Sequence, residues 1–168
     1  VYEYFSFKSS QAFEEFYNTV PQGCKYFFEM AREGTMVKLY LDVDDEAHTQ
    51  SRSKLDETIP LLCKYYQAKF EKPLDAKDIA VTDGSRQKAS CYKNSFHLTV
   101  NNGHGLVAPG IGENSDMKTF VHGFVAHLES TGRSDLAAAV DKGVYTPNRM
   151  MRMVGSCKAD DATRTPFR

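Results

Sequence analysis

The sequence lacks the features that would place it in a membrane or a secretory pathway. No apolar run approaches the roughly eighteen residues that cross a bilayer. The opening residues, VYEYFSFKSS, have no basic region followed by an apolar stretch, so we expect no secretory signal. They begin in mid-pattern without Met, which suggests a segment of a longer protein. The 168 residues are 41% apolar, which is enough for one domain with a real core.

Closely spaced cysteine and histidine ligands for a metal ion are also absent from the sequence. No two of the four cysteines have the spacing of a zinc knuckle, and no two of the five histidines form an HxxxH pair. The sequence has no internal repeat and no low-complexity tract. Four separate thiols indicate a reducing, intracellular compartment, which the sequence does not narrow to nucleus, mitochondrion or virus.

The net charge of −1 does not by itself indicate a nucleic-acid partner, but the charges are unevenly distributed. Residues 42–57 contain six acidic side chains and two basic ones, whereas residues 141–168 contain six basic side chains and three acidic ones. Such segments could hold cations and polyanions side by side. Ordinary surface charge is the alternative.

The most informative stretch is 36–45, which reads MVKLYLDVDD and alternates as a strand does. Its apolar positions define one buried face: Val37, Leu39, Leu41 and Val43. Asp42 and Asp44 project together from the other face, about 7 Å apart along the strand, at its predicted C-terminal end. Paired carboxylates suit hard divalent cations. The alternative is that these residues simply end a strand and open a loop.

A second strand is predicted over residues 93–101, with Phe96, Leu98 and Val100 on its buried face. Lys93, Ser95 and His97 occupy the other face, where all three can donate hydrogen bonds to phosphate oxygens. Two alternatives remain open. Serine and histidine could be a nucleophile and its base, although no third group to orient them is evident. The histidine could also be half-buried and satisfied by a neighbour.

Further candidates lie near the C-terminal end of the sequence. A third carboxylate, Asp141, would complete a two-metal site, although an aspartate before Lys142-Gly143 is also typical of a turn. Arg149 and Arg152, with Lys158 beyond them, suit phosphates and base edges, because guanidinium groups donate paired hydrogen bonds. A solvated basic rim is the alternative.

The remaining patterns predict an α+β fold with a mainly antiparallel sheet. Helices are expected after a serine cap at Ser9 or Ser10, over 53–70 with a kink or break at Pro60, over 115–131, and over 134–139. Residues 24–44 resemble a β-hairpin with a turn at Glu33-Gly34-Thr35.

Three stretches, in order, resemble the archaeo-eukaryotic primase superfamily and, within it, the primase-polymerase branch. They are KLYLDVD, YKNSFHLTV and VDKGVYTPNRMMRMVGSCK. The first motif of that branch is a strand ending in Asp-x-Asp or Asp-x-Glu, and the second is Ser-x-His, often with Lys two residues ahead. The third is an Asp followed by VYT-x-NR-xx-R and a later Lys, and it is the most specific of the three.

The resemblance implies a single catalytic domain over residues 1–168, with a small helical N-terminal part and an RRM-like, mainly antiparallel sheet around a cleft. It implies a DNA primase or polymerase that adds nucleotides to a primer 3′-hydroxyl with two Mg²⁺ or Mn²⁺ ions. The metal ligands would be Asp42, Asp44 and Asp141. The triphosphate would contact Lys93, Ser95, His97, Arg152 and Lys158, and the nascent base pair and template would contact Arg149 and Arg152.

The implied partners are nucleoside triphosphates, single-stranded DNA template and primer–template, with no membrane. The chain would act as a monomer or as part of a larger replication polypeptide. The Cys/His module that follows the core in several relatives is absent, so we expect extension of primers rather than their initiation. Two other functions remain open: a catalytically inactive RRM-like module that binds single-stranded nucleic acid, and a metal-dependent nuclease with His97 as its base.

Overall fold

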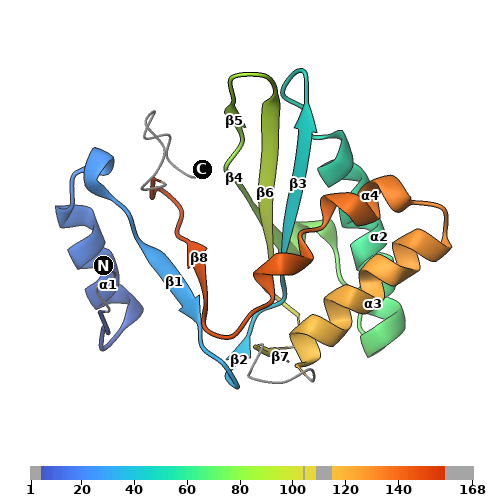
Figure 1. Cartoon of the computed structure of the whole chain (residues 1–168). Helices are drawn as coiled ribbons and strands as arrows, with labels where there is room; N and C mark the ends of the chain where they lie inside the picture. The colour runs from blue at the N-terminus through green and yellow to red at the C-terminus, as the bar shows by residue number, and fades with distance from the viewer. Residues whose placement is uncertain (1–4, 104, 109–114, 158–168) are drawn as a thin grey trace.

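Two antiparallel strands, β3 (Tyr40–Ala47) and β6 (Tyr92–Val100), form the centre of the fold and pair along the whole of β3. The computed structural model describes residues 5–103, 105–108 and 115–157. On the other edge of β6 lies β4 (Ile79–Asp83), and β5 (Arg86–Gln87) continues along the same edge. The predicted antiparallel α+β architecture is confirmed, with the sheet upright in the middle of the molecule (Figure 1).

Three helices lie to one side of this sheet: α2 (Ser53–Phe70), α3 (Asp116–Ser130) and α4 (Ser134–Ala139) (Figure 1). Between the helices and the sheet lies the core, in which these side chains are almost fully buried: Leu41, Val43, Leu55, Leu62, Leu98, Phe124 and Leu128. The strand residues come from the alternating apolar positions of the sequence, so burial of one strand face against amphipathic helices drives the packing. No helix in the described ranges is both long and apolar enough to span a membrane.

The predicted helices over 53–70, 115–131 and 134–139 are confirmed within a residue. Ser115 caps α3, where its hydroxyl accepts a hydrogen bond from the backbone N–H of Lys118 at 3.0 Å. Helix α2 runs through Pro60, so of the predicted kink or break the break does not occur. Side chains on both sides of the proline are buried in the core, and this burial offsets the roughly 3 kcal/mol that an interior proline costs.

The β-hairpin predicted over residues 24–44 is wrong. Strand β1 (Phe28–Ala31) pairs with β8 (Arg149–Arg152), and β2 (Met36–Val37) pairs with β7 (Leu106–Val107). Residues 36–45 therefore do not form one strand, because β2 and β3 pair with different partners. A local alternation of apolar residues predicts that a segment is extended, but it carries little information about a partner distant in sequence.

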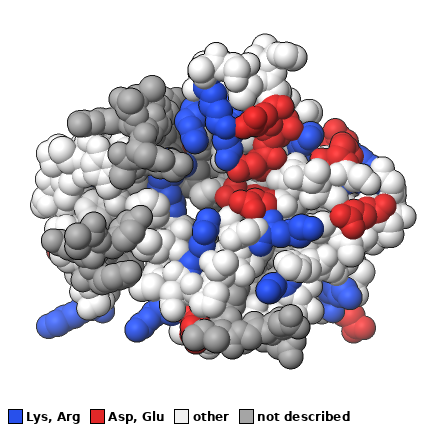
Figure 2. All heavy atoms as spheres, viewed as in Figure 1, with Lys and Arg blue, Asp and Glu red and all other residues white. Residues whose placement is uncertain are grey.

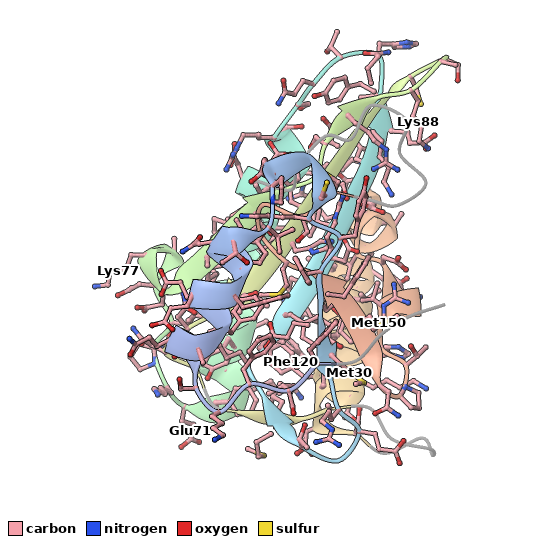
Figure 3. The ribbon with its side chains drawn as sticks, turned by 90° about the vertical axis from the view of Figure 1, so that its left-hand side faces the viewer. Met30, Glu71, Lys77, Lys88, Phe120 and Met150 are labelled. Atoms are coloured by element: carbon pink, nitrogen blue, oxygen red, sulfur yellow. The ribbon has the colours of Figure 1, made fainter. Side chains whose placement is uncertain are left out.

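The N-terminal helix α1 (Ser10–Thr19) belongs to a small unit on the side of β1 and β8 away from the main sheet (Figure 1). Ser9 caps it, as predicted, by accepting a hydrogen bond from the Ala12 N–H at 3.1 Å. The Tyr17 hydroxyl donates to the Val154 carbonyl at 2.5 Å, which ties the helix to the segment after β8. In Figure 3, Met30 and Met150 lie beside each other on the two paired strands.

Gly155 generates the first testable prediction. It has φ +79°, and a Cβ there would lie 2.7 Å from the Tyr17 hydroxyl oxygen. Gly132 has φ +78° and no atom within 4 Å of its Cβ position. Gly132→Ala should cost about 1 kcal/mol of unfolding free energy through backbone strain alone. Gly155→Ala should cost about 1 kcal/mol more, because the Tyr17 hydrogen bond is displaced.

Urea unfolding followed by circular dichroism measures the difference between these two variants. Because the two glycines share nearly the same φ, their backbone terms cancel. Equal losses of stability would contradict the role assigned to the contact between α1 and the segment after β8.

Candidate metal centre

The register of β3 and β6 brings the two predicted polar strand faces together. Asp42 lies opposite His97, Asp44 lies opposite Ser95, and Glu46 lies opposite Lys93. Residues directly opposite each other in an antiparallel pair project from the same face of the sheet. The carboxylates of one strand and the hydrogen-bond donors of the other therefore share one surface, while the apolar residues between them face the helices.

Asp141 joins this surface from the segment after α4. Val140 forms an isolated antiparallel bridge with Val43, and the Asp141 backbone N–H donates to the Asp42 carbonyl at 2.9 Å. The Asp141 carboxylate accepts a hydrogen bond from the Gly143 N–H at 2.7 Å and so caps the short 3₁₀ turn η3 (Lys142–Val144). Asp141 can therefore be both the turn residue and the third carboxylate, because capping the turn uses only one of its two carboxylate oxygens.

The three aspartates form one cluster. One carboxylate oxygen from each lies within 4.8 Å of the other two. Asp42 is buried, at 8% exposure, while Asp44 and Asp141 are half-buried. The idea that Asp42 and Asp44 end a strand is wrong, because β3 continues to Ala47 and both lie in its interior.

This donor set fits a hard divalent cation. Within the described part of the chain, the Oδ1 atoms of Asp42 and Asp44 are buried and have no hydrogen-bond partner. A buried charged oxygen without a partner is costly, and a cation bound by oxygen ligands removes that cost. Carboxylates drawn from three positions are the ligands that Mg²⁺ and Mn²⁺ prefer.

The second oxygens of the same two carboxylates face basic side chains. The Lys93 ammonium reaches diagonally across the strands and pairs with Asp44 Oδ2. His97 Nε2 lies 3.4 Å from Asp42 Oδ2, with 15% of its side chain exposed. Each of the two carboxylates therefore turns one oxygen toward a basic group on β6, while its other oxygen is buried without a hydrogen-bond partner among the described residues.

Two tyrosines pack beside the cluster, and the sequence patterns alone assign them no role: Tyr40 precedes Asp42 by two residues on β3 and shares its face. The rings of Tyr40 and Tyr145 stack with centroids 5.4 Å apart, and the Tyr145 hydroxyl donates to the Tyr40 carbonyl at 3.0 Å. Burial, followed by the nearby charges of Tyr40, Asp42 and Asp141, raises the pKa of Tyr145 well above its ordinary value. Tyr145 belongs to the VYT triplet after Asp141, which is part of the third stretch. The triplet alone does not reveal that this tyrosine packs beside the carboxylates.

The structure separates the basic residues of the third stretch. Arg149 and Arg152 lie on β8, opposite Ala31 and Phe28, and alternation puts them on opposite faces of that strand. Burial raises the pKa of Tyr40 above its ordinary value. The positive charge of Arg149 acts in the opposite direction, so Arg149 lies close enough to the tyrosine pair to affect Tyr40. Lys158 lies outside the described residues. The roles predicted for these residues, Arg152 and Lys158 at the triphosphate and Arg149 and Arg152 at the template, stay predictions.

Figure 2 shows how the charges are arranged on the face that carries the cluster. The acidic side chains gather over β3, and a group of Lys and Arg side chains lies directly beside them over β5. Two of the basic residues beside the acidic side chains, Lys88 and Lys93, pair with Glu46 and Asp44 and come from the β5–β6 region, not from the basic segment 141–168.

A family model described as the C962R protein N-terminal AEP domain matches residues 2–167. The chain belongs to this family. AEP stands for archaeo-eukaryotic primase, so the superfamily predicted from the three stretches is confirmed over almost the whole sequence. A search of curated proteins found no match to the chain.

Within this archaeo-eukaryotic primase domain, Ser85 is a further residue that the sequence did not single out. Its hydroxyl accepts a hydrogen bond from the Ser95 backbone N–H at 3.0 Å, and the Gly84 N–H donates to the Ser95 carbonyl at 2.8 Å. Both contacts hold the β6 segment between Lys93 and His97 in place. No motif marks this role, because it depends on a cross-strand neighbour.

The cluster predicts that metal binding stabilises the fold. Saturating Mn²⁺, at about a hundred times its Kd, should raise the unfolding free energy by about 2.7 kcal/mol in the wild type. Asp141→Asn should remove most of this gain, because the amide can still cap η3 but no longer carries a charge. Thermal unfolding with and without Mn²⁺ measures both effects.

A matched control is Asp56→Asn, which removes a carboxylate on the exposed surface of α2, 4.0 Å from Arg52. It should keep the full response to Mn²⁺. If the Asp141 and Asp56 variants respond equally, Asp141 does not bind the cation.

Proposed function

We propose that this chain is a template-directed nucleotidyltransferase of the primase-polymerase type, which adds nucleotides to a primer 3′-hydroxyl. One observation carries the proposal: three carboxylates converge on one face of the sheet, directly beside a strand that presents Lys93, Ser95 and His97. Family membership supports nucleotidyl transfer as the class of reaction. In this proposal the chain is a single catalytic domain, and its sheet forms the RRM-like wall of a cleft.

The cofactors in this proposal are two Mg²⁺ or Mn²⁺ ions held by Asp42, Asp44 and Asp141. Such ions supply activation of the attacking hydroxyl and neutralise charge on the leaving pyrophosphate. The chain contributes a rigid set of oxygens, since Asp42 and Asp44 lie within a paired strand and Asp141 is fixed by its cap. Ligands on paired strands lose little conformational freedom when they bind.

The donors of β6 have a second role in the proposal. Lys93 and His97 each face a carboxylate oxygen in the structure. When those carboxylates bind cations, the attraction holding the two basic groups weakens, and they become available to the triphosphate oxygens. Their contribution is electrostatic stabilisation rather than proton transfer, and Ser95 adds a hydroxyl donor between them. Lys158 and Arg152 are proposed to join them.

The proposed partners are nucleoside triphosphates, single-stranded DNA template and primer–template. Arg149 and Arg152 would contact the nascent base pair and template, because arginine suits phosphates and base edges. The two alternatives are outcomes of the same experiment. A nuclease would need a base that activates water. His97 is the candidate for that base, and in the structure it faces the Asp42 carboxylate. An inactive binding module would hold the DNA without any change in its length.

Primer extension on a sequencing gel, with Mg²⁺ or Mn²⁺ and a labelled annealed primer, tests the function. We expect longer products from the wild type, and a loss of at least a hundredfold in rate for Asp141→Ala. The Asp56→Asn variant should extend normally. Shortened primers would instead indicate a nuclease, and an unchanged primer that is still bound would indicate a binding module.

His97→Ala tests the triphosphate contact. Loss of one hydrogen bond to a charged group costs about 1.5–3 kcal/mol, so nucleotide affinity should fall roughly ten- to a hundredfold. Affinity for primer–template should change little. Both are measured by equilibrium titration, with thermal unfolding alongside. If the variant loses stability sharply but keeps its nucleotide affinity, His97 has a structural role only.

A further inference from the structure

A fourth hydrogen-bond donor, Arg86, extends the surface formed by Lys93, Ser95 and His97 on β6. The pairing of β4 and β5 with β6 places Thr82 opposite His97 and Arg86 opposite Lys93. Arg86 therefore projects from the same face as Lys93, Ser95 and His97. It lies one strand further from β3 than Lys93 does, at the end of the surface away from Asp42.

The lysines around Arg86 are already paired with carboxylates. Lys93 pairs with Asp44, and Lys88 pairs with Glu46. The hydrogen bond between Lys88 and Glu46 is the main cause of the raised pKa of Lys88, while the positive charge of Arg86 acts to lower that pKa. Arg86 is thus close enough to Lys88 for the two positive charges to repel each other.

Arg86 has no comparable partner. In the part of the chain that the structure describes, no carboxylate lies within 4.0 Å of its guanidinium, although its side chain is half-buried. The guanidinium therefore lacks the carboxylate partner that each neighbouring lysine has, and an anion bound there would be attracted by Arg86 and by the adjacent lysines. The guanidinium also presents paired N–H donors that match phosphate geometry, which an ammonium does not.

The position of Arg86 relative to the aspartate cluster indicates which phosphate it would bind. The aspartate cluster lies at the His97 end, so the phosphate that reacts belongs there in the proposed function. The cluster includes Asp44, which lies opposite Ser95, so Lys93 and Arg86 occupy the next row, one two-residue step of about 7 Å further along β6. The Lys93 side chain already reaches back from this row to Asp44. A phosphate chain that starts at the cluster therefore ends within reach of the side chains of this row.

We propose that Arg86 binds the terminal phosphate of the incoming nucleoside triphosphate, beside Lys93. This inference rests on the proposed function. Arg86 forms the two-donor contact, and Lys93 supplies an adjacent positive charge. The contact distinguishes a triphosphate from a diphosphate, because only the longer chain reaches the last row of donors.

Equilibrium binding in Ca²⁺, an oxygen-binding cation used here in place of Mg²⁺, tests the inference with dATP, dADP and dAMP as probes. Arg86→Ala should weaken dATP binding roughly ten- to a hundredfold and dADP or dAMP binding by less than about threefold. Arg86→Lys should recover only part of the loss. Lys77→Ala, which removes a positive charge on a part of the surface away from Lys88, should change none of the affinities (Figure 3).

Three results would overturn the inference. An equal loss for all three nucleotides would place Arg86 at another part of the nucleotide. A loss of primer–template affinity with unchanged dATP affinity would make it a contact to the DNA backbone. If the Arg86 and Lys77 variants had the same nucleotide affinities, Arg86 would have no role in nucleotide binding. Arg86→Gln, which keeps a polar side chain but removes the charge, replaces the alanine variant if that variant unfolds.

These results are distinguishable from failure of the proposed function. If the folded wild type neither extends a primer nor binds dATP with a divalent cation, both proposals fail. If the wild type extends a primer and Asp141→Ala does not, but Arg86→Ala binds dATP as tightly as the wild type does, only the Arg86 assignment fails.

Discussion

The pairing register of β3 with β6 is the constraint on which the rest of the structure depends. It sets Asp42 against His97 and Asp44 against Ser95, and it turns the intervening leucine and valine side chains into the core. A slip of one residue would bury the carboxylates against the helices and expose the apolar side chains. The penalty for burying two ionised carboxylates in an apolar core is large, so the same register that holds the core together also protects the site from rearrangement.

The sequence predicts this central part well, because an alternating pattern specifies which side chains share a face. It predicted the two strands, the three helices and the residue types of the cluster. It failed where the partner of a strand had to be chosen, as for β1, which pairs with β8 instead of its neighbour in the sequence. The position of Asp141 also could not be derived, since it depends on one short bridge between Val43 and Val140. The resemblance to a family supplied what local patterns could not.

The site is held in place by interactions that do not themselves take part in binding. The stacked tyrosines lie beside the carboxylates, Gly143 orients Asp141, and Ser85 anchors the backbone of Ser95. The Gly143 contact fixes one carboxylate directly and the other contacts fix the strands that carry the site, although three clustered carboxylates repel one another. The packing energy of the helices and sheet offsets that repulsion, so the stability of the core sustains an arrangement of charge that is unfavourable without a cation.

The pairing of β1 with β8 has a consequence for the order in which the chain folds. Phe28 and Arg152 are partners, so 123 of the 168 residues lie between them. Closing so long a loop costs entropy before any contact compensates for it, and contacts of this sequence separation form slowly. During synthesis α1 and β1 are made well before β8, the partner of β1. We therefore expect the central sheet and its helices to form before β1 pairs with β8 and before the Tyr17 hydroxyl bonds to the Val154 carbonyl.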